Sequence, residues 1–161
     1  MYLFCSLNKN EKEHYLPRLF DILYSNMKDI APSGLSYDEE RAQFLLEVSS
    51  ALDKEPRRIV LCYCDDELIG FLMYYTRQNL LMIEELQLVK RYQRTRAFYS
   101  LCRYMKSVLP ENIELVESFV HKSNENSISL QKWLGLDAIE QVSESLLHLR
   151  GRASYLKQKI K

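Results

Sequence analysis

The chain has 161 residues, of which 47% are hydrophobic and 27% are charged, values typical of a folded globular protein, so we expect residues 1–161 to form one domain. The 22 basic and 22 acidic residues cancel, which argues against a protein whose affinity for nucleic acid depends on a globally basic surface. The chain has only 4 glycines, so a glycine-rich phosphate-binding loop is hard to build.

Residues 1–7 lack a basic region and a long apolar run, so we expect no secretory signal peptide. The longest apolar runs, 59–64 and 69–75, are too short to cross a membrane. The cysteines lack the histidine neighbours and the spacing of a zinc site, so we expect core or half-buried thiols, no metal, and a reducing cytoplasm. They are Cys5, Cys62, Cys64 and Cys102.

The first third of the chain predicts a strand and two helices. Residues 2–7 read as the strand, and Pro17 is expected in the first turn of a helix. Ser36 and Glu39 have the spacing of a capping box, which would open a second helix that Pro56 ends.

The middle of the chain predicts an antiparallel meander, because the apolar period changes to that of strands. The three expected strands are residues 58–64, 67–76 and 80–89. A basic loop over residues 90–96 and a helix over residues 98–109 follow.

The last third predicts a strand, a helix and two short strands. The strand covers residues 113–120, and the helix covers residues 124–134 and ends at a Gly135 cap. The two short strands lie within residues 136–150. The order of elements is that of a mixed α/β domain.

Three segments, in this order, carry a resemblance to a known family. Residues 68–75 read LIGFLMYY, residues 83–93 read IEELQLVKRYQ, and residues 124–136 read NENSISLQKWLGL. They resemble the third strand, the fourth strand with its exit, and the late N-x-x-[AS]-I-x-L-Y-x-x-L-G-F motif of the GNAT superfamily of acyl-CoA-dependent N-acetyltransferases. The resemblance implies an α/β (α+β) fold with a mostly antiparallel sheet of six to seven strands and about four helices.

The resemblance also implies a reaction, the transfer of an acetyl group from acetyl-CoA to a primary amine by direct attack. A carboxylate must first take a proton from the amine. Alignment with polyamine acetyltransferases places this base at Glu84, with Glu85 in reserve. Because neighbouring strand residues point to opposite faces, only one of the two is expected to face the cleft. The alternative for each is a solvated charge on a half-exposed strand.

The implied cofactor site covers the end of the expected strand 80–89 and the loop after it. A backbone N–H within residues 86–88 would meet the acyl oxygen, and the same edge would pair with pantetheine like an added strand. The amides of residues 94–98 would hold the pyrophosphate. Asn124 would cap a helix and contact CoA. The implied cofactor residues are Leu86, Gln87, Leu88, Gln93, Arg94, Thr95, Arg96, Ala97, Phe98, Asn124 and Gln131.

Two departures from the family pattern stand in this implied site. Arg96 and Phe98 occupy positions where the loop Q/R-x-x-G-x-G/A has glycine or alanine, and the bulk of Phe98 threatens the approach of a phosphate. Gln131 replaces a tyrosine that often protonates the departing thiolate, and glutamine cannot supply that proton in the same way. A non-catalytic GNAT-like module that binds CoA or a protein is therefore the alternative function.

A local basic cluster lies in the loop after the expected strand 80–89. It consists of Lys90, Arg91, Arg94 and Arg96. Three interpretations are open: a site for CoA phosphates, a solvated loop, and a small nucleic-acid patch.

The acceptor side is expected to include Tyr74 or Tyr75, one facing the cleft and the other packing beneath a helix. The acceptor stays open between a small-molecule amine and a peptide amine, and a homodimer also stays open. His14, His121 and His148 are isolated in the sequence and show no metal spacing.

Overall fold

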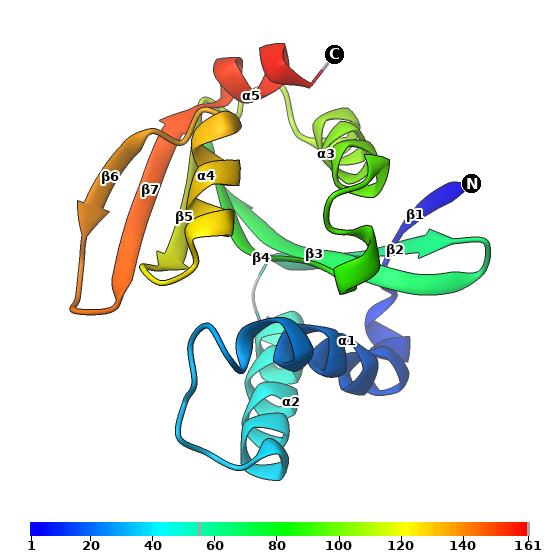
Figure 1. Cartoon of the computed structure of the whole chain (residues 1–161). Coiled ribbons are helices and arrows are strands. Elements are labelled where there is room, and N and C mark those ends of the chain that lie inside the picture. Colours follow the sequence, from blue (N-terminus) through cyan, green and yellow to red (C-terminus); the bar gives the residue numbers. More distant parts are fainter. Residues whose placement is uncertain (55, 161) are drawn as a thin grey trace.

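The computed structural model describes residues 1–54 and 56–160, which form a seven-stranded sheet with helices on both faces (Figure 1). The spatial order is β1-β2-β3-β4-β5-β7-β6, and only β4 and β5 run parallel to each other. The strands are β1 (Tyr2–Ser6), β2 (Arg57–Cys64), β3 (Glu67–Arg77), β4 (Leu80–Leu88), β5 (Leu115–His121), β6 (Ala138–Gln141) and β7 (Leu146–Arg152). The expected mixed fold with a mostly antiparallel sheet is confirmed.

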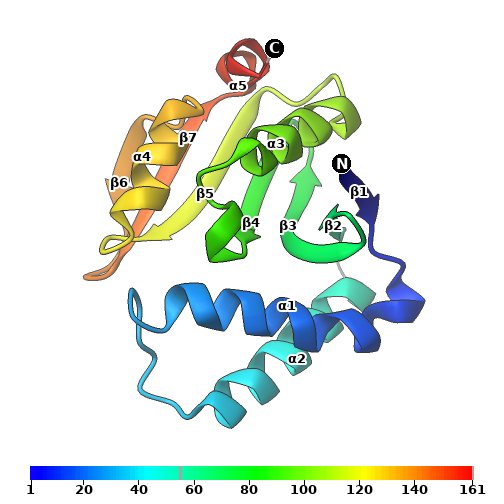
Figure 2. The same ribbon diagram turned by 45° about the vertical axis from the view of Figure 1, so that its right-hand side comes forward.

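Two helices cover one face of the sheet, and three lie on the other (Figures 1 and 2). The first face carries α1 (Lys12–Met27) and α2 (Tyr37–Lys54). The second carries α3 (Arg96–Val108), α4 (Glu125–Trp133) and α5 (Ala153–Lys159), and the short 3-10 turns are η1 (Lys9–Glu11) and η2 (Lys90–Tyr92). Every helix in the described ranges is too short or too polar to span a membrane.

Alternation along the central strands supplies a separate core to each layer of helices. Ile59, Phe71 and Met73 face α1 and α2, where they pack with Leu16 and Leu19. The side chains between them face α3, α4 and α5. This second core includes Val60, Leu72, Leu81, Ile83, Leu101, Met105, Leu134 and Leu156. The sheet is therefore buried on both faces at its centre.

Strand β4 contains one residue more than the stretch of β3 beside it. Met73 lies opposite Glu85 and Tyr74 lies opposite Ile83, so Glu84 has no partner of its own. This is a β-bulge, which bends the strand and increases its twist. Directly before the bulge, β4 pairs with β5, from Leu80 to Ile83, and the described residues show no pairing of β4 with β5 beyond that point. The two parallel strands therefore separate at the bulge.

Helix α1 begins earlier than Pro17 predicted, since it starts at Lys12 and Pro17 lies in its second turn. The helical run opens before α1, at Asn8, whose side-chain oxygen accepts a hydrogen bond from the backbone N–H of Asn10 (3.1 Å) and caps η1, which leads into α1. Proline marks a helix start only by its frequency there, whereas the asparagine satisfies a backbone donor.

The capping box at the start of α2 is confirmed. The hydroxyl of Ser36 accepts from the backbone N–H of Glu39 (3.3 Å), and the Glu39 carboxylate accepts from the backbone N–H of Ser36 (2.8 Å). The hydrogen bonds that the Glu39 carboxylate accepts from the Ser36 backbone N–H and from the Ser36 hydroxyl lower the pKa of Glu39. Helix α5, in contrast, was missing from the predicted elements, because its apolar stripe is only two turns long.

Gly70 allows β3 to approach the exit of β4 closely. A Cβ at this position would lie 2.3 Å from the backbone oxygen of Gln87 and 2.6 Å from Cδ2 of Leu88. We predict that Gly70→Ala lowers the free energy of unfolding by about 2 kcal/mol or more, because the backbone of β4 must shift. Urea denaturation measures this. The exposed Ser25→Ala on α1 is the control and should stay within about 0.5 kcal/mol of the wild type; a Gly70→Ala protein equally stable would contradict the close approach.

Candidate active site

The bulge places Glu84 and Glu85 on the same face of the sheet. Glu85 lies opposite Met73, which packs in the core beneath α1 and α2. Glu84 bonds to Arg57, which lies two residues before Ile59 in β2 and therefore on the same face of the sheet as Ile59. The expectation that the two glutamates point to opposite faces is therefore wrong, because the strand does not keep its simple alternation through a bulge.

Glu84 is held in an ion pair with Arg57. Nε and Nη2 of the guanidinium each donate to one carboxylate oxygen, which is the bidentate arrangement. The Arg57 and Glu84 side chains are only 16% and 19% exposed. The Glu84 charge is therefore neutralised at short range and linked to β2, across the strand that lies between β2 and β4.

Glu85 has a different environment. Its Oε2 accepts a hydrogen bond from Nε2 of Gln87 (2.8 Å), and the described residues offer it no ion-pair partner. Burial raises the pKa of the Glu85 carboxyl to about 7; the Gln87 hydrogen bond opposes this rise and the neighbouring Glu84 charge adds to it. Glu85 can therefore exchange a proton near neutral pH.

The edge of β4 beyond the bulge faces the space that β5 leaves. Leu86 and Leu88 alternate with residues that bond to β3, so their backbone groups point toward this space. The Leu88 carbonyl accepts from Nδ2 of Asn26 (2.9 Å) and from Nε2 of Gln93 (3.0 Å). Leu86 lies directly beside Glu85, so an extended ligand on this edge would pass the carboxyl.

The loop after β4 leads into the N-terminus of α3. Thr95 caps this helix, since its hydroxyl accepts from the backbone N–H of Ala97 (3.2 Å). Arg94 and Arg96 are exposed, while Phe98 packs into the cores beneath α3. The bulk of Phe98 therefore points away from the loop surface, whereas Arg96 is exposed on it.

The basic cluster is divided in the structure. Arg91 bonds to the Glu67 carboxylate and lies over the Tyr92 ring, with 5.2 Å from its guanidinium carbon to the ring centroid. Arg94 and Arg96 flank the start of α3 instead. Only the second pair stands beside helix N–H groups, which favour an anion.

Helix α4 contributes two of the expected cofactor residues. The Asn124 side-chain oxygen accepts from the backbone N–H of Ser127 (3.1 Å), and its Nδ2 lies 3.7 Å from Sδ of Met27 at the end of α1. Gln131 donates from Nε2 to the Ser127 hydroxyl (3.2 Å). Its Oε1 is buried without a hydrogen-bond partner, so this site retains one unused acceptor.

Neither a family profile nor a curated protein matches the chain. Several solved structures match it in fold. PaiA N-acetyltransferase from Thermoplasma acidophilum, in complex with coenzyme A, gives a TM-score of 0.71 at 16% identity over 94% of this chain and 99% of that chain. An acetyltransferase from Thermus thermophilus gives 0.75 at 13% identity over 94% and 97%. FdhC, a nucleotide-linked sugar GNAT, gives 0.65 at 13% identity over 98% and 89%. The chain has the GNAT fold.

In this GNAT fold Tyr74 and Tyr75 lie on opposite faces of the sheet. Tyr74 is buried beneath α3, 6% exposed, and burial raises its pKa. Tyr75 lies opposite Arg57 and Met82, on the side of the two glutamates, and is partly exposed. Only Tyr75 is thus placed to contact a molecule beside Glu84 and Glu85, and Tyr74 leaves the candidate site.

Sequence reasoning missed a third carboxylate on this face. Glu117 of β5 neighbours Met82 of β4, and its Oε2 lies 2.9 Å from Nε2 of His148 on β7. The His148 ring stacks on Phe119, with ring centroids 4.5 Å apart. His148 is thus not isolated, but the partners are 31 residues apart and only the β5–β7 register joins them.

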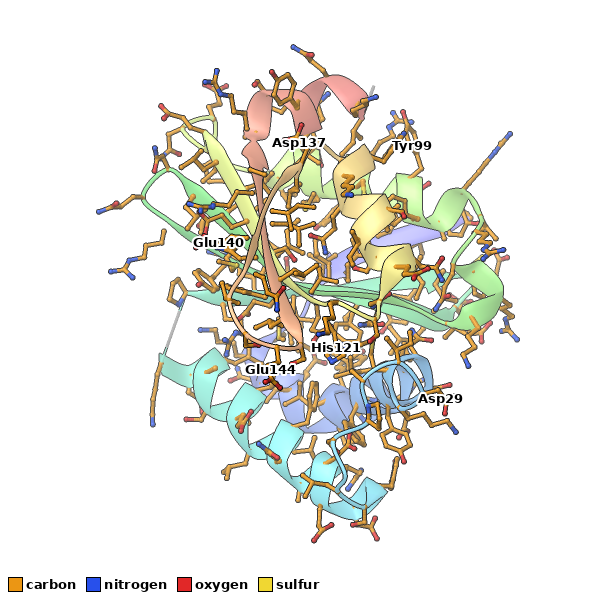
Figure 3. All side chains as sticks on the ribbon, turned by 60° about the vertical axis from the view of Figure 1, so that its left-hand side comes forward. Asp29, Tyr99, His121, Asp137, Glu140 and Glu144 are labelled. Atoms are coloured by element: carbon orange, nitrogen blue, oxygen red, sulfur yellow. The ribbon has the colours of Figure 1, made fainter. Side chains whose placement is uncertain are left out.

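The rim of this face is formed by two chain turns. Figure 3 labels His121 at the end of β5 and Glu144 in the turn between β6 and β7. The backbone N–H of Lys122 donates to the Ser145 carbonyl (2.8 Å), so the two segments lie side by side. Figures 1 and 2 place the connection between α1 and α2 next to this turn.

The cysteines and the other titratable groups do not form a second centre. Burial raises the pKa of Cys62 and of Cys102 to about 12, so neither thiol is a nucleophile at neutral pH. Cys5 is exposed and Cys64 is half-buried. Within residues 1–54 and 56–160, no group of three or more His, Cys, Asp or Glu side chains has the arrangement of a metal site.

The environment of Glu85 predicts a pH-dependent stability. The rise of its pKa from 4.5 to about 7 means that the folded chain holds the proton more tightly than the unfolded chain. The stability gained from this proton is present at low pH and is lost as the pH rises through about 7. Between pH 5 and pH 8, the free energy of unfolding of Glu85→Gln should therefore rise by about 2 kcal/mol relative to that of the wild type.

Urea denaturation of both proteins at these two pH values measures the difference. Glu84→Gln is the control, since its carboxylate is paired with Arg57. A constant difference between Glu85→Gln and the wild type across the pH range would contradict the buried state of Glu85.

Proposed function

We propose that the protein is an acetyl-CoA-dependent N-acetyltransferase that acts on a primary amine. The observation that carries the proposal is Glu85, a carboxyl without an ion-pair partner among the described residues and with a pKa of about 7, beside the open edge of β4 in a GNAT fold. A general base is most effective when its pKa is near the working pH.

The residues of the site fit acetyl-CoA, which would supply an activated acyl group. The backbone of Leu86 and the N–H of Leu88 would pair with the extended pantetheine arm, since the Leu88 carbonyl is already engaged by Asn26 and Gln93. The start of α3 with Arg94 and Arg96 would hold the phosphates. The direction of Phe98 into the core supports this fit, as does the unused acceptor Oε1 of Gln131. The backbone N–H of Leu86 would stabilise negative charge on the acyl oxygen.

The residues of this chain then divide the chemistry as follows. Glu85 takes a proton from the ammonium form of the acceptor, directly or through water. The amine nitrogen forms a bond to the acyl carbon, the bond from that carbon to sulfur breaks, and the nitrogen loses its second proton to water. The thiolate takes a proton from water, since Gln131 has no acidic proton to give. The products are the acetamide and CoA.

The proposal takes Glu85 as the base, although the alignment favoured Glu84. Arg57 donates two hydrogen bonds to Glu84 and occupies both of its oxygens, so this carboxylate has little capacity left for a substrate proton. Glu84 instead is the extra residue of the bulge and contributes negative charge next to Glu85. Tyr75 and the Glu117–His148 pair would line the acceptor side on the same face.

The first test is the binding of coenzyme A and of acetyl-CoA, measured by isothermal titration calorimetry. Replacing both Arg94 and Arg96 by alanine should weaken binding at least about tenfold, because charge-assisted hydrogen bonds to phosphate are lost. Arg103→Ala, an exposed arginine farther along α3, is the matched control and should bind like the wild type. Absence of binding at millimolar ligand would exclude the proposed enzyme and favour a module that binds a protein.

The second test is turnover, followed as thiol release from acetyl-CoA with a panel of diamines and lysine peptides. We expect kcat/KM of the wild type to rise with pH through about 7, as Glu85 loses its proton. Glu85→Gln should lower kcat about a hundredfold or more and remove this rise. Glu84→Gln should retain most of its turnover. Equal losses in the two variants would contradict the assignment of Glu85, and CoA binding without turnover on any amine would favour the non-catalytic module.

A further inference from the structure

Four side chains, Glu85 included, form one series of hydrogen bonds that begins in the loop after β4. Nε2 of Gln93 donates to Oδ1 of Asn26 (3.0 Å), and Nδ2 of Asn26 donates to Oε1 of Gln87 (2.9 Å). Nε2 of Gln87 then donates to Oε2 of Glu85 (2.8 Å). We call this series the amide relay. It runs from the loop through α1 to the carboxyl on β4.

The backbone carbonyl of Leu88 determines the direction of the amide relay. It accepts from Nδ2 of Asn26 (2.9 Å) and from Nε2 of Gln93 (3.0 Å), and a carbonyl cannot donate. Asn26 must therefore turn its NH2 group toward Leu88 and Gln87, and its oxygen toward Gln93. Because Oε1 of Gln87 is engaged by this NH2 group, only the NH2 group of Gln87 is left to face Glu85.

We propose that Asn26 is a positioning residue for Glu85, because it fixes the orientation of the Gln87 amide that meets the carboxyl. The inference rests on the proposed function where it treats Glu85 as the base. Asn26 bonds to the Leu88 carbonyl at the end of the β4 edge, and it reaches Glu85 through Gln87. The sequence resemblance implied no role for Asn26, which lies 61 residues from Gln87.

The orientation matters because the two protonation states of a carboxyl need opposite partners. An ionised carboxylate only accepts, so an N–H from Gln87 favours it, while a protonated carboxyl donates and would favour the Gln87 oxygen. The charged groups around Glu85 are Glu84 beside it and Arg57, which is paired with Glu84. Asn26 is uncharged. The amide relay thus keeps a buried carboxyl ready to release its proton near neutral pH.

The test measures the midpoint of the Glu85 titration by carbon-13 NMR of the full chain labelled at glutamate carboxyls, with Glu85→Gln to assign the signal. Asn26→Asp has the same shape but only accepts, so the Gln87 NH2 group should turn toward it and leave the oxygen facing Glu85. We expect the midpoint to rise by about one pH unit, which makes Glu85 about tenfold less ionised on the acid side. An unchanged midpoint would overturn the proposal.

Two controls separate the amide relay from the added charge. Ser25→Asp places a carboxylate at the neighbouring, exposed position of α1 and should shift the midpoint by less than about 0.3 pH unit. Gln87→Leu removes the connecting amide, so adding Asn26→Asp to it should produce little further shift. A full shift in the Gln87→Leu background, or an equal shift in Ser25→Asp, would show that Asn26 acts by its charge and not through Gln87.

If Asn26→Asp does not fold, as judged by circular dichroism, Asn26→Ala replaces it. Alanine removes all three hydrogen bonds of the Asn26 side chain without adding a charge. We expect a smaller upward shift that also disappears in the Gln87→Leu background; no shift would overturn the proposal. The titration needs neither acetyl-CoA nor turnover. A wild type that binds no CoA but shows these shifts would therefore remove the proposed function and leave the positioning role of Asn26 intact.

Discussion

The extra residue in β4 is the constraint on which the site depends. Before it, Leu81 and Ile83 point toward α3, and after it Leu86 and Leu88 do so. Odd-numbered residues therefore face α3 before the inserted residue and even-numbered residues face it afterwards, so the apolar side chains stay buried. The same insertion brings two acids to one face and turns the strand away from β5. A regular strand would give neither the acid pair nor the open edge.

Glu84 and Glu85 can be neighbours because their different surroundings favour different charge states. Two ionised carboxylates side by side in a partly buried place repel each other, and one of them must then be neutralised or protonated. Arg57 neutralises Glu84, and burial leaves Glu85 holding its proton more tightly. Pairs of like groups with opposed environments are a common basis for acid and base assignments in enzymes. Here the division comes from β2 on one side and α1 on the other.

Much of the fold could be predicted from the sequence, because apolar periods and local caps are short-range signals. The capping box at Ser36, the meander and the cap at Asn124 all follow from residues that lie close together in the chain. The bulge also left a local trace that the analysis did not use. Apolar residues at 81, 83, 86 and 88 have one interval of three among intervals of two.

The remaining features of the site depend on pairings between distant segments. Asn26 reaches β4 only because α1 packs across that strand, and His148 meets Glu117 only through the register of β7 with β5. No local pattern encodes either contact. Phe98 was interpreted as an obstacle because its position was compared with a glycine of a loop. In the structure α3 already begins at Arg96, so Phe98 is a helical residue with its side chain in the core.

An open edge in the middle of a sheet has a consequence for the behaviour of the protein in a crowded solution. Unpaired backbone groups on a strand attract the strands of other chains, which leads to mispairing and aggregation. The edge of β4 after Ile83 is short, and two amide side chains already occupy its last carbonyl, at Leu88. Asn26 and Gln93 therefore act as a stop for any foreign strand, while the backbone at Leu86 stays open to a single narrow chain.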